Sequence, residues 1–415
     1  MNRFSKYLRY TYNKITGSIA FYPAIIAIGF LFLSWLMLEL DYSQLGKQFK
    51  SDFKWVRLKD ATTALSIVST IVGGVISLTV FSFSMVMILL NQAASQMSNR
   101  MLSSMIGNRF QQIILGFYIG TIVYALFLLS SIRNIDSGVY VPALSIYLLL
   151  LLTVGDIFLF IYFLHYVTQS VKFETIITRV HKKTVHTLNQ ICNDEHQEQY
   201  ETPEKKGQMV AMYSSDYYQG FNERELIRFA CEHGGTIQFL HPAGAYLLKG
   251  SPLLVFHGPK QLTEEDLKKI FMPIDLFNGQ PLEKNPYYGY HQLAEVAIKA
   301  LSPGINDPET AVLSIHALTD LFLFRLNHYI KTVFKDNNNE TRVVSVEWNF
   351  EQLFGECFYP IWNYGKDDLY IQNTLANMLE QLMQADKEGN HKVIFDNFLE
   401  KLHAQKAENH LKFSG

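Results

Sequence analysis

Four long apolar segments occupy the first 170 residues of this 415-residue chain and constrain its fold more than any other feature. They lie at residues 19–39, 62–90, 112–132 and 142–167. A helix needs roughly 20 consecutive apolar residues to cross the hydrocarbon core of a bilayer, and each segment reaches that length. The sequence therefore predicts a membrane α-helical protein with four transmembrane helices and the lipid bilayer as a partner.

The chain starts with a basic leader over residues 1–18, followed directly by the first apolar segment. A cleaved signal peptide is the competing interpretation of this pattern. The apolar run is longer than the usual core of a signal peptide, and Pro23 and Trp35 interrupt it. We therefore expect an uncleaved first span in a transmembrane domain over residues 19–170.

Charge and cysteine usage indicate the compartment. The formal net charge is −2, which argues against nucleic acid as a partner, because nucleic-acid-binding domains usually carry a basic surface. The three cysteines lack Cys-x-x-Cys spacing and fit a reducing compartment. An even number of spans puts both termini on one side, and Lys and Arg near the span ends favour the inside modestly. We expect both termini in the cytoplasm.

Beyond the fourth span the sequence predicts a cytoplasmic domain of mixed α/β and helical structure. Apolar and basic residues alternate at helical spacing over residues 171–193, which predicts a helical extension of span four. Residues 194–207 are polar and form a linker. A small α/β subdomain is expected at 208–289, and a mainly helical subdomain at 290–415.

Local signals place elements within these two subdomains. Short apolar runs between Gly and Pro turns predict four strands. These lie at 208–213, 236–240, 245–248 and 252–256. Asn222 with Glu225, and Thr263 with Asp266, have the spacing of capping boxes that start helices. Further helices are expected at 290–301, 308–331 and toward the end of the chain, with an asparagine-rich loop at 336–340.

The second apolar segment carries a polar residue at every seventh position from Thr63 onward. The candidate pore-lining residues are Thr70, Ser77, Ser84, Asn91 and Ser98. A seven-residue repeat keeps such residues near one face of a helix, with a drift of about 20° per repeat if the helix is straight. The stripe either lines a water-filled path or packs closely against another helix, because small residues let membrane helices approach each other. Both interpretations stay open.

Two ionisable residues fall within the fourth span. Asp156 lies at its middle, after Gly155, and intramembrane carboxyl groups usually face a cavity or a partner. Three interpretations of Asp156 remain: a protonated donor of one interhelical hydrogen bond, a group that handles ions or protons, and a residue at the membrane interface. His165 closes the span and is expected to be interfacial.

A crowded turn joins two predicted helices of the tail. It contains Ser302, Pro303, Gly304, Asn306 and Asp307. Asp307 is placed as an N-cap, with Pro308 at the first helical position, and this is ordinary capping chemistry. The functional alternative is that the helix N-terminus and the turn backbone hold an anion or a neighbouring loop.

Motifs for catalysis and metal binding are missing from the sequence. His181 and His186 are five residues apart, and neither His-Glu-x-x-His nor a P-loop occurs. We expect no metal, no cofactor and no enzymatic activity.

Several blocks resemble a family of bacterial predicted membrane proteins, domain of unknown function 2254. They are Ser-Leu-Thr-Val-Phe-Ser-Phe-Ser at 77–84, Asn-Gln-Ala-Ala-Ser-Gln at 91–96, Asn-Arg-Met-Leu at 99–102, Phe-Ile-Tyr-Phe-Leu-His at 160–165 and Ala-Leu-Ser-Pro-Gly-Ile-Asn-Asp-Pro at 300–308. Tyr166 stands where family members often carry a second histidine, and Glu309 where they carry an aromatic residue. The resemblance implies an integral inner-membrane protein with a cytoplasmic C-terminal domain, and it implies no activity.

The leading hypothesis is an oligomeric inner-membrane channel or transport-type protein, in which the second span lines a path for ions between identical subunits. The cytoplasmic domain would gate the path or sense a signal. The alternative is a membrane-anchored sensor or scaffold whose spans only pack.

Overall fold

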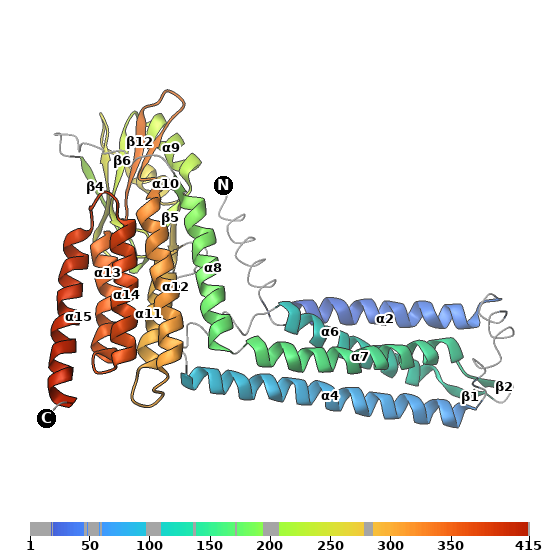
Figure 1. Ribbon diagram of the computed structural model, residues 1–415. Helices are drawn as coiled ribbons and strands as arrows, with labels where there is room; N and C mark the ends of the chain where they lie inside the picture. Colours follow the sequence, from blue (N-terminus) through green and yellow to red (C-terminus); the bar gives the residue numbers. More distant parts are fainter. Residues whose placement is uncertain are drawn as a thin grey trace. The chain divides into compact units, whose positions relative to one another are not determined.

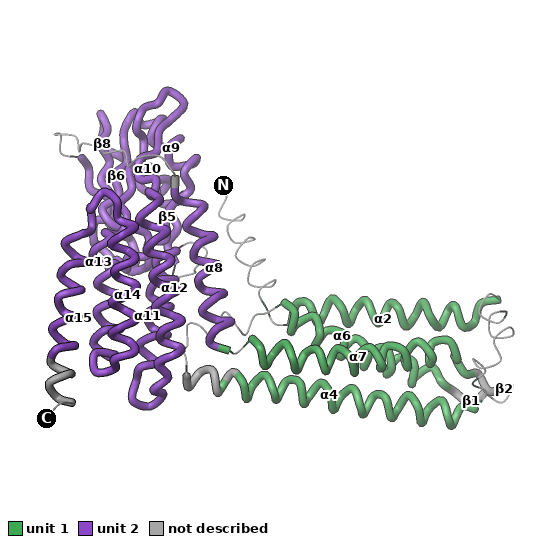
Figure 2. The backbone as a smooth tube through the Cα atoms, in the orientation of Figure 1, with its two compact units in different colours: residues 1–172 green, residues 173–415 purple. Residues whose placement is uncertain are grey.

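The computed structural model describes residues 20–44, 60–96, 109–135, 138–170, 172–193, 207–277 and 285–413, together with positions 18, 48 and 58. The chain divides into two compact units, unit 1 over Met1–Lys172 and unit 2 over Phe173–Gly415 (Figure 2). Residues 1–17 of the leader, Ser98 and residues 194–206 of the expected linker lie outside the described residues.

Within the described residues, unit 1 holds four helices that are long and apolar enough to cross a membrane (Figure 1). They are α2 (Phe21–Tyr42), α4 (Ala61–Gln96), α6 (Arg109–Ser131) and α7 (Ala143–Ser170). Each corresponds to one predicted span, and α4 continues past the expected residue 90 to Gln96. A short antiparallel hairpin of β1 (Arg133–Ile135) and β2 (Gly138–Tyr140) joins α6 to α7.

Helix α6 packs against each of the other three long helices of unit 1. Two glycines allow its close approach to α2. A Cβ atom at Gly116 would lie 2.6 Å from Cδ1 of Ile26, and one at Gly120 would lie 2.7 Å from the ring of Phe30. Small residues permit this kind of close helix packing in membranes. The opposite side of α6 is therefore left to face α4 and α7.

The segment after span four differs from the prediction. A continuous helical extension is expected over 171–193, but α7 ends at Ser170 and a separate helix, α8 (Phe173–Ile191), begins in unit 2. The Ser170 hydroxyl donates to the Val167 carbonyl, and the Lys172 amide donates to the Gln169 carbonyl at 3.3 Å, which tightens and closes the last turn. Helix α8 then packs its apolar face on α11 and α12.

After α8, unit 2 contains a five-stranded and a three-stranded sheet, as far as its residues are described. The larger has the strand order β11-β12-β6-β8-β4, and the smaller has the order β7-β5-β9. Their strands are β4 (Gln208–Ala211), β5 (Asp216–Phe221), β6 (Thr236–Pro242), β7 (Tyr246–Leu247), β8 (Pro252–His257), β9 (Ile274–Phe277), β11 (Val333–Lys335) and β12 (Thr341–Val346). Helices α9 (Glu223–Glu232) and α10 (Glu264–Ile270) accompany them. Ile237, Phe239, Leu254 and Val343 lie in the common core.

The remaining helices of unit 2 form a bundle beside α8 (Figure 1). They are α11 (Tyr287–Ala300), α12 (Pro308–Asn327), α13 (Phe350–Gly365), α14 (Leu369–Ala385) and α15 (Lys392–Phe413). Aromatic rings fill this bundle: Phe322 packs edge-on against Phe354, whose ring in turn contacts Phe395 and Phe398. The thiol of Cys357 lies among them, and burial raises its pKa.

Three features of unit 2 correct the sequence prediction. Strands β5 and β9 are not expected, and the expected boundary at residue 289 does not separate sheet from helices. Strand β12 pairs in parallel with β6, Val343 beside Ile237, and its hairpin with β11 completes the larger sheet. Helix α12 also ends at Asn327 rather than residue 331, because His328 is extended and its chain enters β10 (Tyr329–Ile330), which pairs with β3 (Cys192–Asn193).

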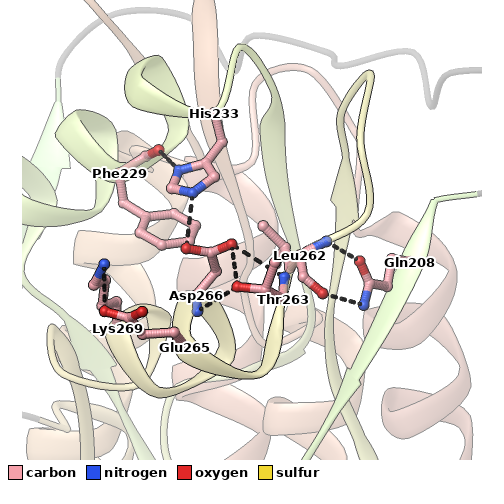
Figure 3. Close-up of polar contacts among 8 residues, drawn as sticks. All are labelled: Gln208, Phe229, His233, Leu262, Thr263, Glu265, Asp266 and Lys269. Carbon is pink, nitrogen blue, oxygen red and sulfur yellow. Dashed lines mark hydrogen bonds and ion pairs between the residues drawn. The ribbon is translucent and has the colours of Figure 1, made fainter.

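Figure 3 shows the predicted start of α10, which the structure confirms as a capping box. Thr263 Oγ1 accepts from the Asp266 amide at 3.3 Å, and the Asp266 carboxylate accepts from the Thr263 amide at 3.0 Å. His233 of α9 places Nε2 3.3 Å from the same carboxylate. The Gln208 side chain accepts from the Leu262 amide at 2.6 Å, so strand β4 is tied to this loop. At α9, the Asn222 side chain accepts from the Glu225 amide.

Candidate functional site

The polar stripe of α4 lies on the face that the other described helices of unit 1 leave uncovered. Thr70, Ser77, Ser84 and Asn91 are exposed. The helix buries a different set, which is Ala61, Ala64, Val68, Ile71, Val75 and Ser82. At about 100° per residue, the two sets lie on opposite sides of the helix. The stripe therefore does not serve to pack α4 onto the other helices of its own chain.

Two hydroxyls on the exposed face of α4 bond to the backbone of their own helix. Thr70 donates to the Ser66 carbonyl, and Ser77 donates to the Gly73 carbonyl, each at 2.8 Å. A Cβ atom at Gly73 or Gly74 would meet no described atom within 4 Å. Hydroxyls bonded to their own helix keep lone pairs that water or a second helix can use. This face can meet either.

Asp156 of α7 lies inside the helix bundle rather than toward the surrounding medium. Its side chain is 1% exposed. Oxygen Oδ2 has no hydrogen-bond partner among the described residues, and the Thr121 hydroxyl of α6 is its polar neighbour without reaching hydrogen-bond geometry. Burying a carboxyl oxygen without a hydrogen-bond partner lowers the stability of the fold.

Three buried hydroxyls lie on the two helices that pack against α7, and sequence patterns do not reveal them. They belong to Ser82 of α4 and to Tyr118 and Thr121 of α6, and each is at most 2% exposed. Within the described structure, none of the three hydroxyl oxygens has a hydrogen-bond partner. Tyr118 has Ser82 as its polar neighbour and also interacts electrostatically with Asp156. The bundle thus contains a cluster of four oxygen-bearing side chains, which we call the buried oxygen cluster.

A pocket lined by residues of α4, α6 and α7 reaches two members of this cluster, Ser82 and Tyr118. Its volume is about 130 Å³, and its walls are mostly apolar. Ser82, Gln112 and Tyr118 are the polar residues deep in its lining, between Val86, Ile114 and Phe163. Since a water molecule needs a cavity of about 10–15 Å³, the pocket has room for several water molecules.

A second buried carboxyl group, Asp41 at the end of α2, has the opposite character. Its oxygens accept from the Leu144 amide at 3.2 Å, the Ser145 amide at 2.8 Å and the Ser145 hydroxyl at 2.6 Å. These donors form the first turn of α7, where the helix dipole favours a negative charge. The Tyr124 hydroxyl donates to the Ser145 carbonyl at 3.0 Å. Asp41 is therefore a structural cap supplied from another helix.

His165 lies near the end of α7 and is exposed. Its carbonyl accepts from the Thr168 hydroxyl at 2.8 Å. It does not belong to the buried oxygen cluster, and the structure brings it into no contact with Asp156. Among the described residues, no three His, Cys, Asp or Glu side chains gather in a way that could hold a metal ion.

In the crowded turn between α11 and α12, the polar residues mainly close or cap the helix ends and allow the backbone to turn. Asp307 accepts from the Thr310 amide at 3.2 Å and from its hydroxyl at 2.6 Å, so it caps α12. Asn306 has a φ of 48°, in the left-handed region that asparagine tolerates better than most residues. The Ser302 hydroxyl donates to the Lys299 carbonyl at 2.6 Å and closes α11.

An anion does not fit this turn well. Asp307 and Glu309 already bring two carboxylates to the start of α12. Glu309 also accepts from the Tyr370 hydroxyl of α14 at 2.8 Å, which gives a local reason for a glutamate here. Pro303 and Gly304 remain exposed, so the docking of a loop is the functional interpretation that survives.

Comparison with known proteins adds a family and no activity. A family model described as predicted membrane protein (DUF2254) matches residues 16–381. An uncharacterized protein of Mycobacterium tuberculosis (strain CDC 1551) is 27% identical over 275 residues, which cover 63% of this chain and 51% of that protein. An uncharacterized protein of Mycobacterium bovis is 26% identical over the same length. The chain thus matches about half of each relative's length, and no solved structure matches it.

Proposed function

The chain belongs to the DUF2254 family of predicted membrane proteins, and on that premise we propose that it is an oligomeric channel or transport-type protein. Its four long apolar helices would cross a bacterial inner membrane with both termini in the cytoplasm. Identical subunits would meet along α4, and the path for ions would run beside the polar stripe. Unit 2, on the cytoplasmic side, would gate the path or sense a signal.

The outward position of the stripe carries this proposal. Thr70, Ser77, Ser84 and Asn91 are exposed on the face of α4 that no other described helix of unit 1 covers. A lipid-facing surface gains nothing from a repeated polar residue, because lipid tails offer hydroxyls and amides no hydrogen bonds. In a closed ring of subunits the same face of every copy can point to the symmetry axis, where water satisfies the polar groups.

Dry packing between copies is the alternative, and it makes the protein a membrane-anchored sensor or scaffold. Gly73 and Ser77 give α4 the small-residue spacing that favours tight helix contact. The two functions differ in what happens when the stripe is filled with a bulky apolar side chain. A pore would lose water and close, whereas a tight helix contact would be forced apart.

The test is ion flux from liposomes that contain the purified full-length protein. We expect Ser84→Leu to suppress flux while the oligomer persists in detergent, because a ring of leucines excludes water from the path. Ser84→Asp should shift selectivity toward cations, because its charge would stand in the path. Loss of the oligomer in the leucine variant, with no flux from the wild type under voltage, tension or low osmolarity, would favour the scaffold.

Ser69→Leu is the matched control for this experiment. Ser69 is also an exposed serine of α4, but it lies beside the stripe, about 100° around the helix from Thr70 and about 60° from Ser84. The same chemical change at this position should leave flux near the wild-type level. Equal suppression by Ser69→Leu and Ser84→Leu would mean that the stripe has no special role.

A further inference from the structure

The buried oxygen cluster brings together polar side chains from three helices that all contact one another. Ser82 lies on α4, Tyr118 and Thr121 lie three residues apart on one side of α6, and Asp156 lies on α7. Each of the four side chains is at most 2% exposed, and each has an oxygen without a hydrogen-bond partner among the described residues. Ordinary helix packing does not leave four such oxygens unbonded in one place.

Neighbouring hydroxyls show how helix packing usually satisfies such groups. Thr79 on α4 donates to the Val75 carbonyl at 2.7 Å, and Thr153 on α7 donates to the Leu149 carbonyl at 2.8 Å. This bond to the preceding turn is the usual one for Ser and Thr inside helices. Ser82 and Thr121 leave the same bond unmade. Their oxygens are therefore available to a ligand that the cluster surrounds.

The cluster also has an unbalanced charge if Asp156 is ionised. Buried charges in proteins are paired or coordinate metal ions. On the described parts of the helices that form the cluster, Arg109 precedes Thr121 by 12 residues, about 18 Å along the helix. On α7, no Lys or Arg lies between Asp156 and the end of the helix at Ser170. Arg109 is not placed to neutralise the carboxylate, so no basic residue on the described parts of these helices balances an ionised Asp156, and a bound cation would supply that charge.

We propose that Ser82, Tyr118, Thr121 and Asp156 bind one monovalent cation such as Na⁺ inside each subunit. Carboxylate and hydroxyl oxygens are hard ligands, which suit hard cations. A single carboxylate balances a single positive charge, whereas sites for divalent ions usually collect several carboxylates. The pocket of about 130 Å³ that Ser82 and Tyr118 help to line is large enough for an ion with water beside these two ligands.

This site is separate from the path proposed above. Ser82 belongs to the buried face of α4, and the stripe that includes Ser84 belongs to the opposite face. Binding can be measured in the absence of flux. Failure of the channel proposal therefore leaves the cation site standing, and the reverse also holds.

The experiment measures radioactive Na⁺ binding to the full-length protein in lipid nanodiscs, with choline chloride holding the ionic strength constant. We expect saturable binding with one ion per subunit in the wild type. Asp156→Asn should abolish it, because the amide keeps the shape of the side chain and removes its charge. Thr121→Val should weaken binding about tenfold, which corresponds to about 1.4 kcal/mol.

Thr153→Val is the matched control, because its hydroxyl is already bonded to its own helix and should leave Na⁺ binding unchanged. If Asp156→Asn does not fold, the Na⁺ binding of Thr121→Val compared with that of Thr153→Val tests the proposal instead. The absence of saturable Na⁺ binding in the wild type would overturn the proposal, and a protonated Asp156 would then be the occupant. Equal binding by Thr121→Val and Thr153→Val would also overturn it.

Discussion

Asp41 and Asp156 are both buried carboxyl residues of unit 1, and the donors around them separate their roles. Asp41 accepts three hydrogen bonds from Leu144 and Ser145 at the start of α7. Asp156 has an oxygen without any described donor and faces hydroxyls that make no bond of their own. A carboxylate at a helix N-terminus is a stabilising feature. One without donors is costly to the fold and is better explained by a ligand.

Asp41→Asn should destabilise unit 1 by about 1–3 kcal/mol, because two amides and a hydroxyl lose a charged acceptor. Thermal unfolding of the purified protein in detergent measures the effect. Glu39→Gln is the control, since it makes the same chemical change at an exposed position of the same helix. Equal unfolding midpoints for the Asp41→Asn and Glu39→Gln proteins would contradict the assignment of Asp41 as a cap.

At the scale of single elements, helix α10 depends on a carboxylate that must stay ionised. Hydrogen bonds from the Thr263 side chain, and then from its amide, lower the pKa of Asp266 from 3.8 to about 2. The folded state therefore favours the charged form more than the unfolded state does. That contribution to stability is complete above about pH 4 and is lost as the pH falls toward 2.

Asp266→Asn should consequently remove part of the acid sensitivity of unit 2. Denaturant unfolding followed by circular dichroism between pH 5 and pH 2 should show a shallower loss of stability in the variant than in the wild type. The Arg342 side chain also lowers the pKa of Asp336 to about 2. Asp336 therefore makes the same contribution to the loss of stability at low pH in both proteins. Parallel pH profiles for the wild type and Asp266→Asn would show that the capping carboxylate is not coupled to folding.

At the scale of the whole molecule, the parts that could be predicted are those that adjacent residues specify. Long apolar runs identify the four helices, and a seven-residue repeat places Ser77 and Ser84 on one face. The repeat does not say which face of α4 meets α6 and α7. Burial of Ser82, Tyr118 and Thr121 depends on how three helices pack, so the buried oxygen cluster is not readable from spacing.

Strands show the same limit. Strand β12 pairs in parallel with β6, which lies about a hundred residues earlier in the chain. No local sequence pattern predicts a parallel partner at that distance. Strand β5 alternates poorly, with the polar Gln219 buried beside Tyr218. In the sequence, Asp41 is only a charged residue just after an apolar segment. Its role appears only when the start of α7 is placed next to it.

The central claim is that the polar face of α4 meets water inside an assembly of identical subunits. Its most direct test is the reaction of single cysteines with a membrane-impermeant thiol reagent in liposomes, in a protein whose Cys192 and Cys231 are replaced by serine. Cys357 can stay, because it is fully buried. The comparison is between Ser84→Cys on the stripe and Ser69→Cys beside it, both exposed in the single chain.

A water-filled path predicts that Ser84→Cys reacts at least about tenfold faster than Ser69→Cys, because a thiolate forms in water and hardly at all in lipid. Modification of Ser84→Cys should also reduce ion flux, since the added group would stand in the path. Equal and slow reaction at both positions would contradict the claim, because the stripe would then be dry and α4 would only pack.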